Sequence, residues 1–338
     1  MIANDNVILA IGPAFSDILL QLRDKEYELI QKKFFSSGTW IRLSDRHKLN
    51  ALFKALDIVS PADYMEAGST ILGTLSAMPL NIRRNSTIIT YEGTDNNQIS
   101  FKSYNRYVNT VRNLGINLRV KQVKGANMIG MVFVSNSNRE RLLLTYSDYN
   151  ISFSDDMEIP SAEYLLINGF EMVEPTNNLI YDLIESRNYK VVLGLGSQNI
   201  LHGEFKNRLI EYCKKGYIHC IGGNYQEFQK LYPCNVKLMR EEDVFSSIPY
   251  ILVTLGKNGM IGYDPNVQYY QSAAVINDTD LISTSGAGDI ALGIFLTGII
   301  NQENLQYTLS KAALVSTKIM RRLSNVFSEG IENVHNMC

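Results

Sequence analysis

Short apolar runs alternate with amphipathic stretches along most of the chain. Apolar runs of strand length occupy residues 7–11, 87–91 and 164–167, and residues 103–114 and 204–215 repeat apolar positions at helical spacing. Further strand-like runs cover 190–193, 217–221 and 250–254, and further helical patterns cover 44–56 and 178–186. Strands that alternate with helices in this way are typical of a mostly parallel sheet covered by helices on both faces. The pattern therefore predicts an α/β fold.

Two stretches, residues 17–43 and 116–146, interrupt this alternation. Both are predicted to contain strands without long helices between them, and the runs 128–134 and 141–146 are joined by a polar, turn-rich segment. We expect these two insertions to project from the α/β core as a small β-sheet. The chain shows no internal repeat and no linker, so a single domain over residues 1–338 is expected.

The composition limits the possible partners. The chain has 338 residues, and its 32 Lys and Arg against 34 Asp and Glu leave a net charge of −2, so binding to nucleic acid through bulk charge is not expected. The longest apolar run, residues 290–300, is too short to span a membrane. Four cysteines without a C-x-x-C pair, and an N-terminus without a signal-peptide pattern, favour reduced thiols in a cytoplasmic protein.

The strongest local signal for chemistry is the segment from Ser283 to Asp289, with the sequence STSGAGD, directly before that apolar run. Its glycines and small side chains let a ligand approach the backbone. A helix that begins there directs free N–H groups and its positive dipole end outward, which suits a phosphate group. Two interpretations of Asp289 stay open at this point: a helix N-cap, or a general base beside a phosphate site.

Several motifs together resemble the ribokinase (PfkB) family of sugar and nucleoside kinases. The sequence GAGD at 286–289 followed by an apolar helix resembles the second signature of that family. Residues 253–259 (VTLGKNG) resemble its T-x-G-x-x-G turn, and residues 224–227 (NYQE) resemble its N-x-x-E motif. Residues 67–70 (AGST) resemble the G-G-S-T turn of its substrate site, and GTWIRLSD at 38–45 favours the adenosine-kinase-like branch. The order of these motifs along the chain matches the family.

The resemblance implies a fold and a reaction. The fold would be ribokinase-like, with a three-layer α/β/α core, a mostly parallel central sheet and a lid formed by the two insertions. The reaction would be ATP-dependent phosphorylation of a hydroxymethyl group on a sugar or nucleoside, with adenosine or a ribose-type sugar as the first expectation. The partners would thus be ATP and a small-molecule acceptor, with neither nucleic acid nor membrane involved. The protein would be a monomer or a homodimer.

The resemblance also assigns residues to roles. Asp289 would be the general base, beside an anion site made by Gly286, Ala287 and Gly288. The nucleotide and its Mg²⁺ would be bound by Asn224, Glu227, Thr254, Gly256, Gly259 and Lys311, with Glu227 holding the metal through water. The acceptor would be bound by Asp17, Gly68, Ser69 and Arg141.

Some positions depart from the family pattern. Ser283 stands where the family has an Asp that helps to hold a monovalent cation, so potassium dependence stays open. Ala67 replaces the first glycine of the substrate turn, and Leu72 replaces an Asn that binds a substrate hydroxyl. A catalytically weak or inactive member that binds a nucleotide or nucleoside is therefore the alternative hypothesis. Residues 194–199 (GLGSQN) begin like a dinucleotide-binding turn, but the third glycine is absent, and the chain has no P-loop motif.

Overall fold

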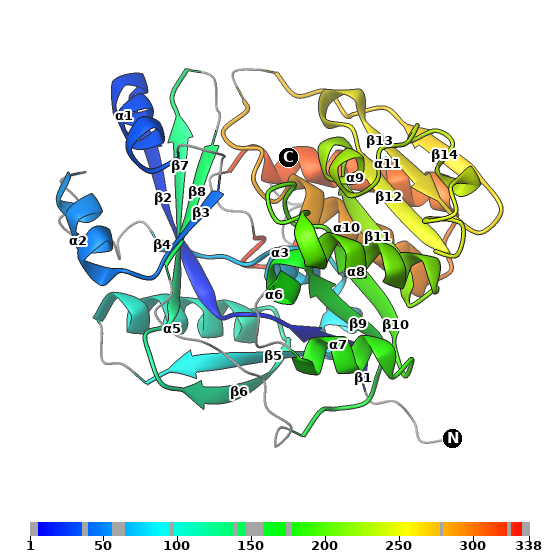
Figure 1. Cartoon of the computed structure of the whole chain (residues 1–338), viewed down its shortest axis with the longest axis horizontal. Coiled ribbons are helices and arrows are strands. Elements are labelled where there is room, and N and C mark those ends of the chain that lie inside the picture. Colours follow the sequence, from blue (N-terminus) through cyan, green and yellow to red (C-terminus); the bar gives the residue numbers. More distant parts are fainter. Residues whose placement is uncertain are drawn as a thin grey trace.

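The computed structural model describes residues 6–35, 40–55, 65–94, 98–137, 141–146, 158–173, 178–277, 280–322 and 326–332. In this part of the chain the larger of two sheets has the strand order β14-β13-β12-β11-β10-β9-β1-β5-β6 (Figure 1). All neighbouring pairs from β12 to β6 are parallel, and β13 and β14 add an antiparallel edge. The strands are β1 (Asn6–Ile11), β5 (Ser86–Gly93), β6 (Asn117–Val123), β9 (Ala162–Asn168), β10 (Lys190–Gly194), β11 (Ile218–Asn224), β12 (Tyr250–Thr254), β13 (Met260–Tyr263) and β14 (Gln268–Gln271).

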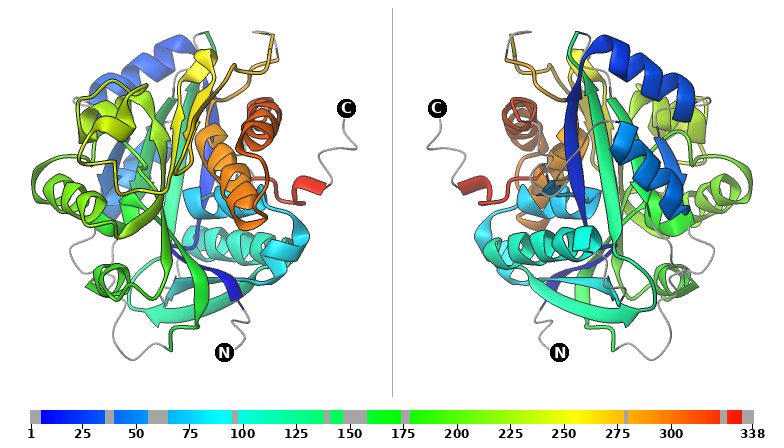
Figure 2. Two further views of the ribbon diagram at one scale, coloured as in Figure 1. Left: turned by 90° about the vertical axis from the view of Figure 1, so that its right-hand side faces the viewer. Right: turned by 90° about the vertical axis from the view of Figure 1, so that its left-hand side faces the viewer.

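Helices cover both faces of this sheet, as the two side views show (Figure 2). One face carries α3 (Thr70–Ser76), α4 (Leu80–Arg84), α5 (Gln98–Asn113), α10 (Ala287–Ile300) and α11 (Leu305–Ile319). The other face carries α6 (Gly169–Val173), α7 (Asn178–Glu185), α8 (Gly203–Lys214) and α9 (Tyr225–Leu231).

The apolar pattern of the central strands explains the layers. In β1, Ile8 and Ala10 lie in the first core, whereas Leu9 and Ile11 lie in the second. Successive side chains of a strand point to opposite faces, so a continuous apolar run fills both cores at once. The predicted three-layer α/β/α architecture with a mostly parallel sheet is confirmed.

The smaller sheet forms the lid. Its strand order is β3-β8-β7-β2-β4, with β2 (Phe15–Leu22), β3 (Trp40–Leu43), β4 (Met65–Ala67), β7 (Met128–Ser135) and β8 (Arg141–Tyr146). Its outer face packs against α1 (Asp24–Phe34) and α2 (Arg46–Ala55) through a third core that includes Ile18, Leu20 and Phe133. Its inner face is turned toward the larger sheet.

Two details of the predicted insertions are wrong. Residues 24–34 form a helix, α1, with Asp24 and Glu26 in its first turn and lysines in its last, a charge order that suits the helix dipole. Residues 117–123 form β6, which pairs with β5 in the large sheet and does not belong to the lid. The reason is topological, because a strand that returns after a crossover helix packs beside the strand before it. The lid part of the second insertion therefore begins at β7.

The described residues also bear on two expectations from the sequence, that the longest apolar run is too short to span a membrane and that the cysteines are reduced. Within the described ranges, no helix has both the length and the apolar character that a bilayer crossing needs. The three cysteines in those ranges, Cys213, Cys220 and Cys234, carry free thiols.

Candidate active site

A cavity of about 1470 Å³ opens where the parallel strands of the large sheet end and the lid begins. The last residues of β9, β10, β11 and β12 line its floor, and residues of β2, β3, β7 and β8 line its lid side. Ligands of α/β sheets bind at the carboxyl ends of parallel strands, where loops leave in opposite directions. This volume exceeds the roughly 300–1,000 Å³ of a typical site for one small molecule.

The start of α10 lies in this cavity. Gly286 is the N-cap residue and has φ +76°, a left-handed conformation that glycine adopts without strain. Ala287, Gly288 and Asp289 are the first three helical residues, and their N–H groups have no acceptor within the helix. A Cβ atom at Gly288 would meet nothing within 4 Å, so the cavity is open there. Residues 290–299 of the helix are buried, which holds this turn rigidly.

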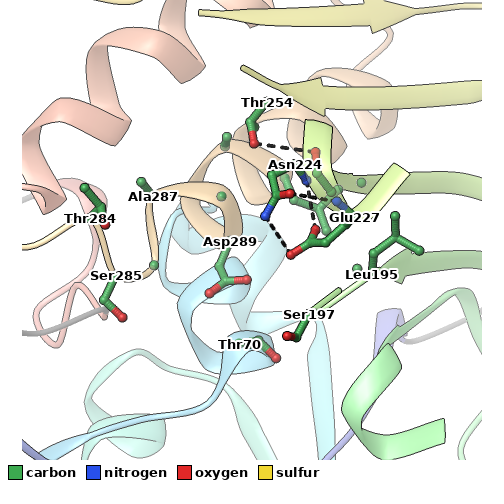
Figure 3. Close-up of a pocket in the computed structure, with 18 of the residues that line it drawn as sticks. Thr70, Leu195, Ser197, Asn224, Glu227, Thr254, Thr284, Ser285, Ala287 and Asp289 are labelled. Atoms are coloured by element: carbon green, nitrogen blue, oxygen red, sulfur yellow. Dashed lines mark hydrogen bonds between the residues drawn. The ribbon is translucent and has the colours of Figure 1, made fainter. Parts of the chain in front are cut away.

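Asp289 is half-buried and lines the cavity (Figure 3). It is the third residue of α10, and the N-cap position belongs to Gly286. The N-cap interpretation of Asp289 is therefore wrong. Its carboxylate therefore lies at the N-terminal end of α10, in the first turn of the helix.

Asn224 and Glu227 form a reciprocal cap at the start of α9. The Glu227 N–H donates to Asn224 Oδ1 at 2.9 Å, the Asn224 N–H donates to Glu227 Oε2 at 2.8 Å, and Asn224 Nδ2 donates to Glu227 Oε1 at 2.8 Å. A Cβ at Gly223 would come within 2.8 Å of Glu227 Oε2. The carboxylate is thus held in one place, and both residues line the cavity (Figure 3).

This pair fits a magnesium ion held through water. The two carboxylate oxygens of Glu227 accept hydrogen bonds from Asn224, and a carboxylate oxygen has more than one lone pair with which to accept hydrogen bonds. Magnesium in phosphoryl-transfer sites keeps several waters and takes few protein ligands besides the phosphates. The described residues hold no cluster of three or more His, Cys, Asp or Glu side chains that would bind a metal by themselves. The side chains present therefore suit the water-mediated role.

The turn from Thr254 to Gly259 forms another wall. Thr254 Oγ1 donates to the carbonyl of Gly223 at 3.5 Å, which ties the ends of β11 and β12 together. Gly259 has φ +93°, and a Cβ there would lie 2.0 Å from the carbonyl oxygen of Gln271. Only glycine fits this position. Gly256, with φ +58°, also lines the cavity.

Asp17 and Ser69 line the lid side of the cavity. Asp17, in β2, is 3% exposed, and a Cβ at Gly68 would lie 2.6 Å from its Oδ2. Gly68 is not itself a lining residue but gives the carboxylate its space. Ser69 has φ +86°, a strained value for serine, and its buried hydroxyl has no hydrogen-bond partner in the described part of the chain.

Two predicted residues are not placed in the cavity. Lys311 is half-buried on α11, but that helix lines the cavity with Ala313, Ser316 and Thr317. Residues two positions apart on a helix face different directions, which explains why Lys311 is not among them. Arg141 is the first residue of β8, and its side chain lies outside the described part of the structure.

Sequence reasoning missed several lining residues. Asn168 is the last residue of β9, Glu171 lies on α6, and Ser197 follows β10. Ser197 belongs to the segment 194–199, which the sequence analysis considered only as a possible dinucleotide-binding turn. Glu171 is buried, and its charge adds to burial in raising the pKa of Tyr107. The usable signal was positional, since each of these residues comes at or soon after the end of a parallel strand.

Comparisons with known proteins agree with this geometry. The sequence model of the pfkB family carbohydrate kinases matches residues 103–327. No curated protein matches the chain by sequence.

Among solved structures, the chain is similar to an adenosine kinase from Sinorhizobium meliloti, with a TM-score of 0.78, 15% identity, and coverage of 99% of this chain and 100% of that one. It is also similar to a probable sugar kinase from Rhizobium etli, with a TM-score of 0.78, 16% identity, and coverage of 99% and 98%. A ribokinase from Thermotoga maritima matches with a TM-score of 0.65, 13% identity, and coverage of 98% of each chain. At these identities the likeness concerns the fold.

Proposed function

The chain belongs to the pfkB family of carbohydrate kinases, and on this premise we propose that it transfers the terminal phosphoryl group of ATP to a hydroxymethyl group of a sugar or nucleoside. The observation that carries the proposal is the start of α10, where the N–H groups of the first helical turn and the carboxylate of Asp289 meet in one cavity. Phosphoryl transfer needs those two parts, charge stabilisation and a positioned base.

The roles at the catalytic end follow from this arrangement. Asp289 accepts the proton of the attacking hydroxyl group. The N–H groups of Ala287, Gly288 and Asp289 donate to the oxygens of the transferring phosphoryl group as negative charge develops there. Gly286 gives the turn its conformation. Because these donors are backbone groups of a buried helix, they need no reorganisation during the reaction.

The nucleotide occupies the end of the cavity away from the lid, between the turn 254–259 and α11. Thr254, Gly256 and Gly259 line the side of the nucleotide. Asn224 and Glu227 hold the waters of a magnesium ion, which when bound neutralises the phosphate charges. Ser283 is buried, and its hydroxyl accepts a hydrogen bond from the N–H of Ser285 at 3.1 Å, so it offers a monovalent cation no negative charge.

The acceptor occupies the lid end of the cavity. Asp17 accepts hydrogen bonds from its hydroxyl groups, and Ser69 offers a further hydroxyl partner. Closure of the lid keeps water away from ATP.

A second function, nucleotide or nucleoside binding without turnover, is favoured by one observation. Leu72 is completely buried in the first core, so α3 offers the acceptor no amide at this position. When an enzyme lacks a polar partner for a hydroxyl group of its substrate, it discriminates much less between that substrate and its analogues.

One experiment separates the two functions. The protein is incubated with ATP, magnesium and single nucleosides or sugars, adenosine and ribose first, with and without potassium, and ADP release is measured. Acceptor-dependent ADP release supports the kinase. Thermal stabilisation by ATP and a nucleoside without any ADP release supports the binding module.

A further inference from the structure

Four residues form one row across the lid sheet. Asp17 in β2 is opposite Gly130 in β7, Gly130 is opposite Thr145 in β8, and Thr145 is opposite Arg42 in β3. Residues opposite each other in neighbouring strands share a face of the sheet. Asp17, Thr145 and Arg42 all line the cavity, so this polar row faces inward. A negative charge stands at one end and a positive charge at the other.

Gly130 leaves room for the carboxylate at the negative end. A Cβ at this position would lie 2.0 Å from Asp17 Oδ1, and a Cβ at Gly68 would lie 2.6 Å from Asp17 Oδ2. The carboxylate therefore sits in a slot between two glycines, where a side chain at either position would collide with one of its oxygens. This slot fixes the place where the hydroxyl groups of the acceptor bind.

Apolar residues flank the polar row on both sides. Phe15 pairs with Met128 on one side, and Val132 pairs with Leu143 on the other, and all four line the cavity. Asp17 and Arg42 are three strand spacings apart, roughly 14 Å. The lid thus offers apolar contact to a ring or chain that reaches from one end of the row to the other, which is longer than a single sugar ring.

Arg42 lies at the far end of the row from Asp17, so its chemistry decides which group of the acceptor molecule can bind there. Its guanidinium group donates hydrogen bonds and accepts none. Among the described residues that line the lid side of the cavity it is the only cation, since Lys257 belongs to the turn at the nucleotide end. Arg42 lines the cavity and is also exposed to solvent, so it can meet the outer end of a large ligand.

We propose that the polar row selects an acceptor whose end remote from the phosphorylated hydroxymethyl group carries an oxygen that accepts hydrogen bonds from Arg42. This inference rests on the proposed function. The oxygen comes either from a carbonyl group of a nucleobase or from a carboxylate of a sugar acid, and both have the acceptor chemistry that Arg42 requires.

The test uses two matched pairs of acceptors, inosine against adenosine and gluconate against glucitol. In each pair only the first carries a carbonyl or carboxylate oxygen at the far end, and glucitol has a neutral hydroxyl group there, which is a weaker partner for a guanidinium group. Wild-type protein is expected to prefer the first member of one pair by about tenfold in kcat/KM, the size of one charge-assisted hydrogen bond at a partly solvated site. The pair that shows the preference identifies the source of the oxygen.

Arg42→Met keeps an unbranched side chain as far as the ε position and removes the guanidinium donors. It is expected to abolish the preference through KM, with kcat changed little, whereas Arg46→Met on α2, an exposed arginine outside the cavity, leaves it intact. Absence of any preference in the wild type, or an equal preference in Arg42→Met, overturns the proposal. An equal loss for both members of a pair also overturns it.

Binding separates this proposal from the proposed function. Thermal shifts with the same four compounds, without ATP, measure selection when no phosphate is transferred. A binding preference in these thermal shifts, together with no ADP release when ATP and magnesium are added, supports the polar row and contradicts the kinase activity. No shift and no turnover with any of the four compounds overturns the proposal.

The slot has a test of its own that does not depend on activity. Gly130→Ala is expected to destabilise the protein when Asp17 is present and to have little effect in an Asp17→Ala background, because the clash is then removed. Equal destabilisation in both backgrounds contradicts the slot.

Discussion

The two ends of the cavity are built in different ways. At the proposed catalytic end, the N–H groups, the left-handed glycine and Asp289 come from four consecutive residues at the start of one buried helix. At the acceptor end, Asp17, Ser69, Gly130, Thr145 and Arg42 come from five separate segments that meet only in the lid and beside it. The catalytic end depends on backbone groups, whereas the acceptor end depends on the identity of side chains.

This difference has a consequence for how each end responds to change. Backbone donors at a helix start survive most substitutions, so the catalytic end is vulnerable mainly at its glycine and its carboxylate. The acceptor end is held by close packing, and a single added methyl group at Gly68 or Gly130 would displace Asp17. Mutations at the first end should therefore change kcat, and mutations at the second end should change KM.

The largest effect is expected for Asp289→Asn. The amide cannot take the proton of the hydroxyl group, so kcat is expected to fall roughly 10²- to 10⁴-fold. Binding of ATP, measured by titration calorimetry, should be nearly unchanged because the backbone donors remain. An unchanged kcat would remove Asp289 from the mechanism.

A smaller effect is expected for Asp17→Asn at the acceptor end. The slot remains filled, but one oxygen that accepts hydrogen bonds becomes a donor, so KM for the acceptor should rise roughly 10- to 100-fold. Steady-state kinetics should show KM for ATP and kcat within a few fold of the wild type. Asp24→Asn, an exposed lid residue outside the cavity, is the matched control. A fall in kcat at constant KM would contradict the division between the two ends.

Glu227→Gln separates capping from metal binding. Glutamine at this position keeps the hydrogen bond from the N-cap N–H of α9, because either residue type can accept it. Its amide nitrogen cannot accept from Asn224 Nδ2, so one hydrogen bond of the cap is lost. The melting temperature should therefore fall only slightly. The magnesium concentration for half-maximal activity should rise about tenfold, because a neutral amide holds metal-bound water less well than a carboxylate. A large drop in melting temperature at unchanged magnesium dependence would assign Glu227 to capping alone.

The smallest effect is expected for Tyr107→Phe, in the core beneath the acceptor end. Burial raises the pKa of the Tyr107 phenol, the charge of Glu171 adds to this, and the hydroxyl has no hydrogen-bond partner among the described residues. Its removal should leave the free energy of unfolding unchanged or raise it by up to about 1 kcal/mol. Urea unfolding at constant m value measures this change. A loss of more than about 1 kcal/mol would mean that the hydroxyl makes a stabilising contact.

The fold was largely predictable, and its errors have a common cause. Strands such as β1 and β12 are continuous apolar runs between turns, and their short length and β-branched residues favour strands over helices. The pattern of β6 is half polar and suits an edge strand of either sheet, so only its pairing with β5 decides where it belongs. Helix α1 buries just Tyr27 and Ile30, which leaves little apolar periodicity to detect.

The candidate site was predictable in the same uneven way. Motifs of a few adjacent residues, such as 224–227 and 286–289, identified lining residues because a cap or a helix start is a local structure. Lys311 was predicted to bind the nucleotide because the sequence identified its helix. The sequence did not show which face of that helix is turned toward the cavity. Glu171 belongs to no motif. Arg42 and Ser197 lie in the segments 38–45 and 194–199, whose sequences did not predict a lining role. The place of all three residues depends on strand ends and strand register.

By itself, then, the sequence determined the layered α/β fold and the turn at the start of α10, because periodicity, glycine conformation and free helix N–H groups are local properties of the chain. The tertiary structure alone decided which side chains face the acceptor. Strands at residues 15–22, 40–43, 128–135 and 141–146 become neighbours through hydrogen bonds between distant segments. A shift of one residue in any of those pairings would turn a different set of side chains inward.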